Sequence, residues 1–210
     1  MKKYIFLLIL SAMPLLGWCD SVSVGSGTHE QEIIPICNWE MGSSLSGSQI
    51  IYLASELSSM PKGSAIKSVS FKSVSRLGNT FGGEFEVRIS ETAGETFESE
   101  TDFKIKDTDE VYGTVSLNGL GTGDVTFPLS SPYIYKGGNL VIDIRSTQLG
   151  DRKGWIYFVS TETENNRSLR YLYLNENMES GACFNVYPNA TFEYDTNVPS
   201  PFADANVKEI

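Results

Sequence analysis

The sequence predicts an all-β protein, an antiparallel β-sandwich with a jelly-roll-like arrangement of strands. Many short segments alternate apolar and polar residues with a period of two, which is the pattern of half-buried strands. Aromatic and β-branched residues are concentrated in these segments and favour strands. Clusters rich in glycine and asparagine lie between them and supply the positive φ values of tight turns. Many short strands joined by such turns are typical of a sandwich or barrel.

Residues 1–19 have the layout of a secretory signal peptide. Lys2 and Lys3 form a short basic start, residues 5–16 are almost all apolar, and a polar segment follows Cys19. The apolar run has roughly 12 residues, whereas a membrane-spanning helix needs about 20. We therefore expect the chain to be exported, with no membrane insertion after the signal is cleaved.

Two processing routes are open at Cys19. Gly17 and Cys19 are small enough for an ordinary signal peptidase, which would place the mature start near Asp20. Residues 16–19 also resemble a degenerate lipobox, in which Cys19 would be lipidated and anchored, but Trp18 does not suit the position before a lipidated cysteine. We favour a secreted, periplasmic or cell-surface protein over a lipoprotein anchored at Cys19.

The rest of the chain divides into an entry segment, one domain and a tail. We expect residues 20–32 to be a flexible entry segment, residues 33–196 to form the β-sandwich, and residues 197–210 to be a proline-containing tail. Residues 48–57 are ambiguous, because their apolar side chains suit one face of a helix as well as a buried strand. We interpret them as mainly strand.

Within the domain, alternation of apolar and polar residues locates the strands. The clearest case is Phe85, Val87 and Ile89, which share one face while polar residues occupy the other. Further strands are expected at 66–71, 111–117, 125–129, 140–145, 155–159, 169–174, 183–187 and 190–194. Turns are expected at 78–79, 82–83, 118–119, 121–123 and 137–139.

Charge and cysteine content restrict the partners and the compartment. A net charge of -10 repels phosphate backbones and anionic lipid heads, so nucleic acid is not an expected partner. Without Cys19, an exported chain retains Cys37 and Cys183. A disulfide between them would stabilise the fold by about 4 to 5 kcal/mol through loop closure. We expect this disulfide, the alternative being two separately buried thiols.

Several short motifs, taken in order, resemble a family of secreted modules. They lie at 22–28, 48–57, 66–71, 87–90, 127–129, 132–135 and 138–142. Together they are similar to the β-sandwich, jelly-roll-type modules of secreted multidomain proteins of Bacteroidetes-type bacteria, which are loosely similar to cleaved-adhesin and carbohydrate-binding domains. The resemblance covers most of residues 22–194 and implies export and a sandwich fold more than a particular ligand.

The sequence does not predict an enzyme. His29 is the single histidine and lies in the expected entry segment, where no surrounding residues would orient it as a catalytic base. No G-x-S-x-G, H-E-x-x-H or phosphate-binding loop occurs. A glycosidase needs only two carboxylates, for which the strand residues Glu84, Glu86, Asp143 and Glu193 are candidates. Outward-facing, solubilising acids are the commoner explanation for such residues.

No cofactor is predicted. Four acidic residues cluster around two lysines and offer the hard oxygens that calcium prefers; they are Asp102, Asp107, Asp109 and Glu110. Their spacing matches no EF-hand, and Lys104 and Lys106 neutralise part of their charge. We interpret this segment as a solvated loop.

Aromatic side chains suggest the ligand. Flat rings on a sheet face or loop rim stack on sugars, and aromatic residues occur on or beside expected strands at Trp39, Trp155, Tyr157, Tyr171 and Tyr173. Packing in the core explains any one of these equally well. Trp155 is the best candidate, because the charged, glycine-containing approach 151–154 favours a ring presented to solvent. The candidate binding residues are therefore Trp155, Tyr157, Arg152 and Asp151.

The expected function is non-catalytic binding or adhesion, with a glycan or a cell-surface protein as the ligand. A structural or assembly subunit of a surface appendage or envelope complex is the alternative. A glycoside hydrolase is the third possibility.

The export prediction is tested by the mass of the mature protein. Because the apolar run is too short to remain in a bilayer, the protein recovered from outside the inner membrane should begin at or near Asp20. Intact-mass spectrometry measures this directly. An intact Met1 would refute export, and a lipid-modified Cys19 would establish the lipoprotein route instead.

Overall fold

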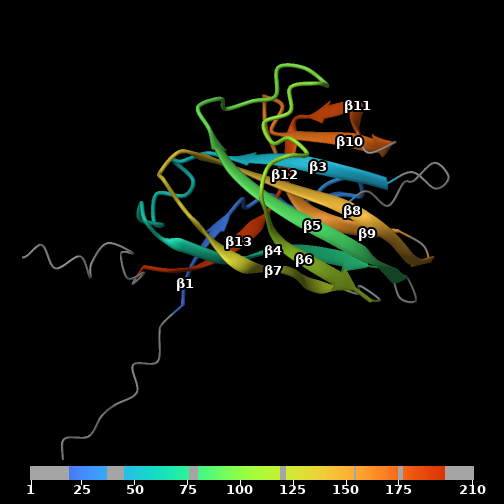
Figure 1. Cartoon of the computed structure of the whole chain (residues 1–210), viewed down its shortest axis with the longest axis horizontal. Helices are drawn as coiled ribbons and strands as arrows, with labels where there is room; N and C mark the ends of the chain where they lie inside the picture. The colour runs from blue at the N-terminus through green and yellow to red at the C-terminus, as the bar shows by residue number, and fades with distance from the viewer. Residues whose placement is uncertain are drawn as a thin grey trace, which may run out of the picture.

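The computed structural model describes residues 19–36, 45–75, 80–118, 122–153, 155–174 and 177–196, and every regular element in these ranges is a β-strand (Figure 1). The strands are β1 (Asp20–Val24), β2 (His29–Gln31), β3 (Leu45–Tyr52), β4 (Ala65–Ser75), β5 (Thr80–Thr92), β6 (Val111–Leu117), β7 (Gly123–Ile134), β8 (Asn139–Lys153), β9 (Ile156–Glu162), β10 (Ser168–Leu174), β11 (Asn177–Phe184), β12 (Val186–Pro188) and β13 (Ala190–Asp195). Residues 1–18 of the expected signal peptide, Cys37 and the expected tail lie outside the described residues.

Two antiparallel sheets pack against each other, which confirms the predicted sandwich. The first sheet has the order β1-β13-β4-β9-β12, with β7 also paired to β4 and β2 to β9. The second sheet has the order β11-β10-β3-β8-β5-β6. The chain passes from one sheet to the other after β2, β3, β4, β6, β7, β8, β9 and β11, as in sandwich folds whose layers are connected repeatedly (Figure 1).

The main core fills the space between the sheets. Strand residues alternate so that Phe71, Phe127 and Phe192 point inward from the first sheet and are almost completely buried. Phe85 points inward from the second sheet, and its ring centroid lies 6.3 Å from that of Phe127 in an edge-to-face contact. Side chains from both layers thus interdigitate as in other sandwiches.

A second apolar cluster covers the outer face of the second sheet. Its buried members are Ile51, Phe97, Ile105, Val141, Leu169 and Tyr171. Phe97 and Ile105 come from the connection 93–110, the loop above the sheet in Figure 1. Because both faces of β3 are covered, Ile50 and Tyr52 enter the main core while Ile51 enters this second cluster. This explains why β3 is buried along almost its whole length and why its last three residues, 50–52, are apolar without alternation.

Arg167 and Glu56 fasten the two sheets at one end. The buried Arg167 guanidinium donates to Ile51 O, 2.9 Å from Nε, and to Glu56 Oε2, 2.6 Å from Nη2. It also lies over the Tyr187 ring of β12, with Cζ 4.6 Å from the ring centroid. The Tyr187 hydroxyl in turn donates to Glu56 Oε1 at 2.8 Å. A residue of the first sheet is thus joined to the loop that follows β3 of the second.

The entry segment differs from the expectation of a flexible lead. Residues 20–24 form β1, which pairs with β13 from Asp20↔Tyr194 to Val24↔Ala190, and residues 29–31 form β2, which pairs with β9. Val22 and Val24 are buried in the core, while serines occupy the alternate positions. This period-two pattern is that of a strand, so the segment belongs to the first sheet.

Two glycine clusters have different roles. Gly137 has φ +96° in the connection between β7 and β8, as expected for a tight turn. Gly82 and Gly83, also expected to form a turn, instead lie inside β5 at a shift in its register with β8. A Cβ at Gly82 would lie 2.9 Å from Leu117 O, so glycine here permits a close backbone approach at a bulge.

The predicted disulfide is not supported. Cys183 carries a free, half-buried thiol in β11, where it packs against the second apolar cluster. Its expected partner Cys37 lies outside the described residues. Burial raises the pKa of the Cys183 thiol, which fits a small apolar packing residue more than a reactive one.

The described ranges contain no helix of the length and hydropathy needed to cross a membrane.

Gly47 provides a test of the packing on the second sheet. Its Cβ would lie 2.4 Å from Tyr171 Oη, because the Tyr171 ring passes over the β3 backbone at this point. Gly47→Ala should therefore displace the ring and lower the free energy of unfolding by about 1 to 3 kcal/mol, the usual cost of overpacking. Urea denaturation measures the change. Gly94→Ala is the control, since its Cβ would meet nothing closer than 3.5 Å, and equal stability of the two variants would contradict the prediction.

Candidate functional site

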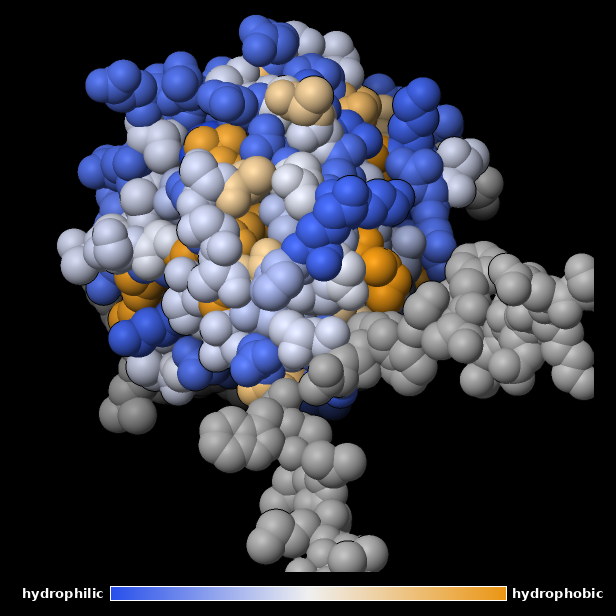
Figure 2. All heavy atoms as spheres, turned by 90° about the vertical axis from the view of Figure 1, so that its left-hand side faces the viewer, coloured by the Kyte–Doolittle hydropathy of each residue, from blue (hydrophilic) through white to orange (hydrophobic). Residues whose placement is uncertain are grey.

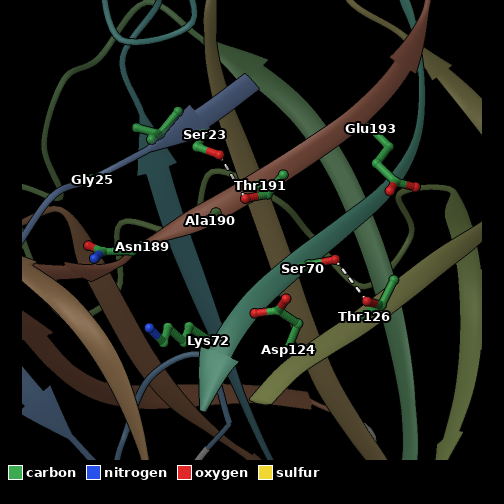
Figure 3. Close-up of a pocket in the computed structure, with 11 residues that line it drawn as sticks. Ser23, Gly25, Ser70, Lys72, Asp124, Thr126, Asn189, Ala190, Thr191 and Glu193 are labelled. Carbon is green, nitrogen blue, oxygen red and sulfur yellow. Dashed lines mark hydrogen bonds between the residues drawn. The ribbon is translucent and has the colours of Figure 1, made fainter. Parts of the chain in front are cut away.

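A polar hollow of about 330 Å³ lies on the outer face of the first sheet (Figure 3). Strands β1, β4, β7 and β13 contribute most of its side chains, and eight of the eleven lining residues carry a hydroxyl, amide or charged group, the others being Val24, Gly25 and Ala190. We call this surface the hydroxyl face and define it by Ser23, Ser70, Lys72, Asp124, Thr126, Asn189, Thr191 and Glu193.

Strand alternation places these side chains on one face. On β4, Phe71 points into the core, so Ser70 and Lys72 point outward. Thr126 on β7 and Thr191 on β13 likewise alternate with buried Phe127 and Phe192. The apolar half of each strand thus fixes the direction of the polar half.

Cross-strand hydrogen bonds order the hydroxyl groups. Ser70 lies opposite Thr126 in the register of β4 and β7, and their hydroxyl oxygens are 2.8 Å apart. Ser23 and Thr191 form the equivalent pair between β1 and β13, at 2.9 Å. Both bonds are drawn in Figure 3. Such pairs hold their side chains in one rotamer and reduce the entropy lost when a ligand binds.

Asn189 closes one side of the hollow. It lies at the break between β12 and β13, where its backbone N–H donates to Val159 O at 2.9 Å. Its side-chain Nδ2 donates to Gly27 O at 2.9 Å, and Thr161 Oγ1 lies 2.7 Å from Asn189 Oδ1. This amide is therefore fixed in orientation.

Charged groups lie at the margins of the hollow. Lys72 and Asp124 are register neighbours on β4 and β7, and both are exposed. Glu193 lies toward the other end in Figure 3, where its Oε2 accepts from the Ser68 hydroxyl at 3.0 Å. The face therefore offers donors and acceptors side by side.

The structure separates the four predicted binding residues. Tyr157 of β9 alternates with buried Ile156 and Phe158, so its half-buried side chain points outward on the sheet that carries the hydroxyl face. It pairs with Val74 of β4, two residues beyond Lys72. Trp155 is 39% exposed just before β9, whereas Asp151 is an exposed residue of β8 in the second sheet. The side chain of Arg152 lies outside the described set.

The hydroxyl face has no signature in the sequence. Ser23, Ser70, Thr126 and Thr191 were not predicted, because single serines and threonines on strands have no distinguishing signal. Their shared feature is an outward position on strands that are neighbours in space but distant in sequence.

The four carboxylates considered for a glycosidase lie on both sheets. Glu193 belongs to the hydroxyl face of the first sheet. Glu84 and Glu86 lie on β5 and Asp143 on β8, all in the second sheet. Asp143 is 1% exposed, so its carboxylate faces packed protein.

A hydrogen-bond network encloses Asp143. Tyr171 Oη lies 2.9 Å from Asp143 Oδ2, and Gln49 Nε2 donates to the same oxygen at 3.0 Å. Tyr171 reaches Asp143 from β10 by crossing β3 at Gly47, which has no side chain to block it. Burial raises the pKa of Asp143 to about 6, while these hydrogen bonds and the Arg145 charge act in the opposite direction.

The acidic loop considered for calcium is held by protein groups. Asp102 forms an ion pair with Lys104 at 2.6 Å, and Asp107 pairs with Arg145. Asp109 Oδ2 accepts from the Lys106 backbone N–H at 2.8 Å. Over the part of the chain that the structure describes, no group of three or more His, Cys, Asp or Glu residues is placed to hold a metal ion.

His29 lies in the short strand β2. Its Nδ1 is 3.7 Å from Glu162 Oε1, and the side chains of both residues are exposed. It borders a separate shallow pocket together with Ser160 and Thr161.

Comparison with known proteins gives one distant structural match. No family model matches the chain, and no curated protein is significantly similar to it. A similar solved structure contains the cysteine protease and lectin-like domains of a surface-layer-associated protein of Clostridium difficile. The alignment has a TM-score of 0.40 and 11% identity, and covers 71% of this chain and 32% of that chain. These comparisons do not identify a Bacteroidetes-type module, and at this level of similarity they assign neither a ligand nor an activity.

The raised pKa of Asp143 gives a pH-dependent test. Its folded-state pKa of about 6 exceeds the ordinary aspartate pKa of 3.8, so the folded protein binds this proton more tightly than the unfolded chain does. The contribution to stability is therefore complete below about pH 4 and is lost as the pH rises to about 6. Asp143→Asn removes this titration.

The free energy of unfolding of the wild type minus that of Asp143→Asn should fall by up to about 3 kcal/mol between pH 4 and pH 7. Urea denaturation of both proteins across this range measures the difference, in which the titration of other carboxylates cancels. A difference that stays constant with pH would show that Asp143 is not titrating as described.

Proposed function

We propose that the protein is an exported, non-catalytic binding module that recognises glycans through the hydroxyl face. The observation that carries this proposal is the ordered array of hydroxyl, amide and charged side chains on neighbouring strands of one sheet. The hydrogen bonds within the array reduce the cost of ordering it around a ligand.

The chemistry of the face suits sugar hydroxyls. A sugar hydroxyl both donates and accepts hydrogen bonds, and serine and threonine hydroxyls do the same. Lys72 adds donors, Asp124 and Glu193 add acceptors, and Asn189 adds both. A polyhydroxylated ligand can satisfy these groups without itself carrying a charge.

Aromatic residues at the edge of the same sheet supply stacking surface. Tyr157 shares the outward direction of Lys72, and the exposed Trp155 precedes the same strand. A sugar ring stacked on either aromatic ring would gain apolar contact that hydroxyl groups do not provide. The glycan is thus expected to extend from the hollow toward β9.

The start of the sheet supports export. Cys19 is exposed and lies directly before β1, and Cys19 Sγ is 3.7 Å from Tyr194 O. Cleavage after residue 19 would leave all five residues of β1 in place against β13. The processing site proposed from the sequence therefore lies outside the first strand of the folded domain.

An assembly subunit is the second candidate function, and the edge position of β1 favours it. β1 ends the path of the first sheet and pairs with β13 alone within the described topology. A strand of a neighbouring subunit could add to this edge. Concentration-dependent association of the purified protein, measured by sedimentation, would support this function over glycan binding.

A glycan-array screen of the purified protein tests glycan recognition, and isosteric variants locate it. Thr126→Val and Thr191→Val keep the β-branched shape but remove one hydroxyl each. Each should weaken binding to an array hit about tenfold, because a sugar hydroxyl in the complex loses its hydrogen-bond partner. Thr114→Val, at an exposed position on β6 of the second sheet, is the control. If all three variants retain binding, the ligand binds elsewhere on the protein. If no glycan on the array binds, a surface protein or a neighbouring subunit is the remaining partner.

Trp155→Ala tests the stacking contribution. With 39% of the residue exposed, its replacement should reduce glycan affinity while changing the free energy of unfolding by less than about 1 kcal/mol. Ile134→Ala is a matched control, because Ile134 is 44% exposed on β7. If Trp155→Ala instead costs about 3 to 5 kcal/mol of stability, the ring is a packing residue and the stacking role is wrong.

A further inference from the structure

A second pocket, of about 500 Å³, opens on the outer face of the second sheet. It is lined by Leu45, Glu86, Arg88, Asp107, Arg145, Ser146, Thr147 and Tyr173. It lies on the opposite side of the sandwich from the hydroxyl face, and none of its residues belongs to that face. We call it the arginine pocket.

Arg145 forms the rigid floor of the arginine pocket. Its side chain is 4% exposed, its Nη1 pairs with Asp107 Oδ1, and its Nη2 lies 3.4 Å from Glu86 Oε2. The guanidinium also lies over the Tyr173 ring, 4.4 Å from the centroid. Planar stacking combined with two carboxylate partners fixes this side chain.

Arg88 has a donor that the protein does not use. Its Nη2 is 2.9 Å from Glu86 Oε2, and its Nε donates to Asp109 O at 3.2 Å. Its Nη1 is buried and has no hydrogen-bond partner among the described residues. Leaving such a group unsatisfied is costly, so each instance calls for an explanation.

Each carboxylate of the pocket has a spare acceptor. Both guanidinium groups contact Oε2 of Glu86, and Arg145 contacts Oδ1 of Asp107. Within the described ranges, the ion pairs use Glu86 Oε2 and Asp107 Oδ1, and no donor is paired with Glu86 Oε1 or Asp107 Oδ2. The carboxylates are also the accessible charges, since their side chains are 28% and 32% exposed. The pocket therefore combines two accessible acceptors with one buried donor that has no partner among the described residues.

The charge of the lining favours a neutral ligand. Two guanidinium groups are matched by two carboxylates, so the pocket carries no net formal charge. The buried Asp143, opposite Arg88 in the register of β5 and β8, adds negative charge below the floor. The carboxylates would repel a bound anion, and the two arginines would repel a bound cation.

From this arrangement we infer that the arginine pocket binds a sugar residue through two hydroxyls on neighbouring carbons. One hydroxyl donates to Glu86 Oε1, beside the unpaired Arg88 Nη1, and the next donates to Asp107 Oδ2. The Tyr173 ring and the Thr147 hydroxyl form the wall beside them. The site is independent of the hydroxyl face, so the protein has two separate sugar-binding surfaces on opposite sheets.

The test measures binding of methyl hexopyranosides to the full protein by ligand-observed NMR. Methyl mannoside, galactoside and glucoside are compared with deoxy analogues that lack one of two neighbouring hydroxyls. At least one parent glycoside should bind, with its deoxy analogue about tenfold or more weaker, because the loss leaves buried polar groups unpaired. Absence of binding by all three parents would overturn the inference.

Two sets of variants distinguish this pocket from the hydroxyl face. Asp107→Asn and Glu86→Gln keep the shape of each side chain and should each weaken the monosaccharide about tenfold, because a charge-assisted hydrogen bond becomes a neutral one. Thr126→Val and Thr191→Val remove hydroxyls from the hydroxyl face alone, and Ile134→Ala, exposed on β7 and outside both sites, is the control that should leave this binding unchanged. Thermal unfolding confirms that each variant is folded, and a binding loss confined to the threonine variants would assign the sugar to the hydroxyl face alone.

Charged probes complete the test. Sodium sulfate and lysine methyl ester are titrated against the protein with and without the bound glycoside. Neither should displace it at concentrations where the ionic strength is matched with sodium chloride. Displacement by sulfate would show an anion site, and displacement by the lysine ester a cation site; either outcome would overturn the assignment of a neutral ligand.

Discussion

Burial of the Asp143 carboxylate is the constraint on which the outer face of the second sheet depends. A carboxylate removed from water must be hydrogen-bonded or neutralised, and here Tyr171, Gln49 and nearby arginines do so. The Gln49 Oε1 atom also accepts from the backbone N–H groups of Lys104 and Ile105, at 2.8 and 3.1 Å. The same network that solvates the acid therefore holds the loop 93–110 against the sheet, and with it Asp107 at the mouth of the arginine pocket.

The two outer faces of the sandwich differ in how far they are exposed to water. The first sheet presents serine and threonine hydroxyls that pair across strands in the open, as expected for a sheet with one solvated face. The second sheet is covered by its own loop, and its charges are partly buried beneath it. Figure 2 shows one side of the molecule, on which apolar side chains lie as separate patches among polar ones. The candidate ligand sites of both faces are therefore polar.

Local pattern predicted the strands well where one face meets the core. Residues 111–117 were expected as a strand and form β6 with the same bounds, and the alternation at Phe85 and Val87 lies within β5. The entry segment was misjudged because Ser21 to Val24 is a short alternation that only β13 stabilises. The carboxylate and arginine at 86 and 88 repeat the spacing of those at 143 and 145, but their pairing depends on register between distant strands. Sites assembled across a sheet in this way have no local signature, and the same holds for the hydroxyl face.

The pairing of β1 with β13 determines how the domain would respond to tension. Residue 20 lies opposite residue 194, and Thr196 Oγ1 is 3.4 Å from Asp20 Oδ2, so the chain enters and leaves the described fold at one corner. Force applied through both flanking segments would peel the two strands apart from Asp20 toward Val24, breaking one hydrogen bond after another. Strands loaded in this way yield at lower force than strands sheared along their length, because the bonds do not share the load. The second sheet and its pocket lie outside this line of force and would keep their structure while the first strand detaches.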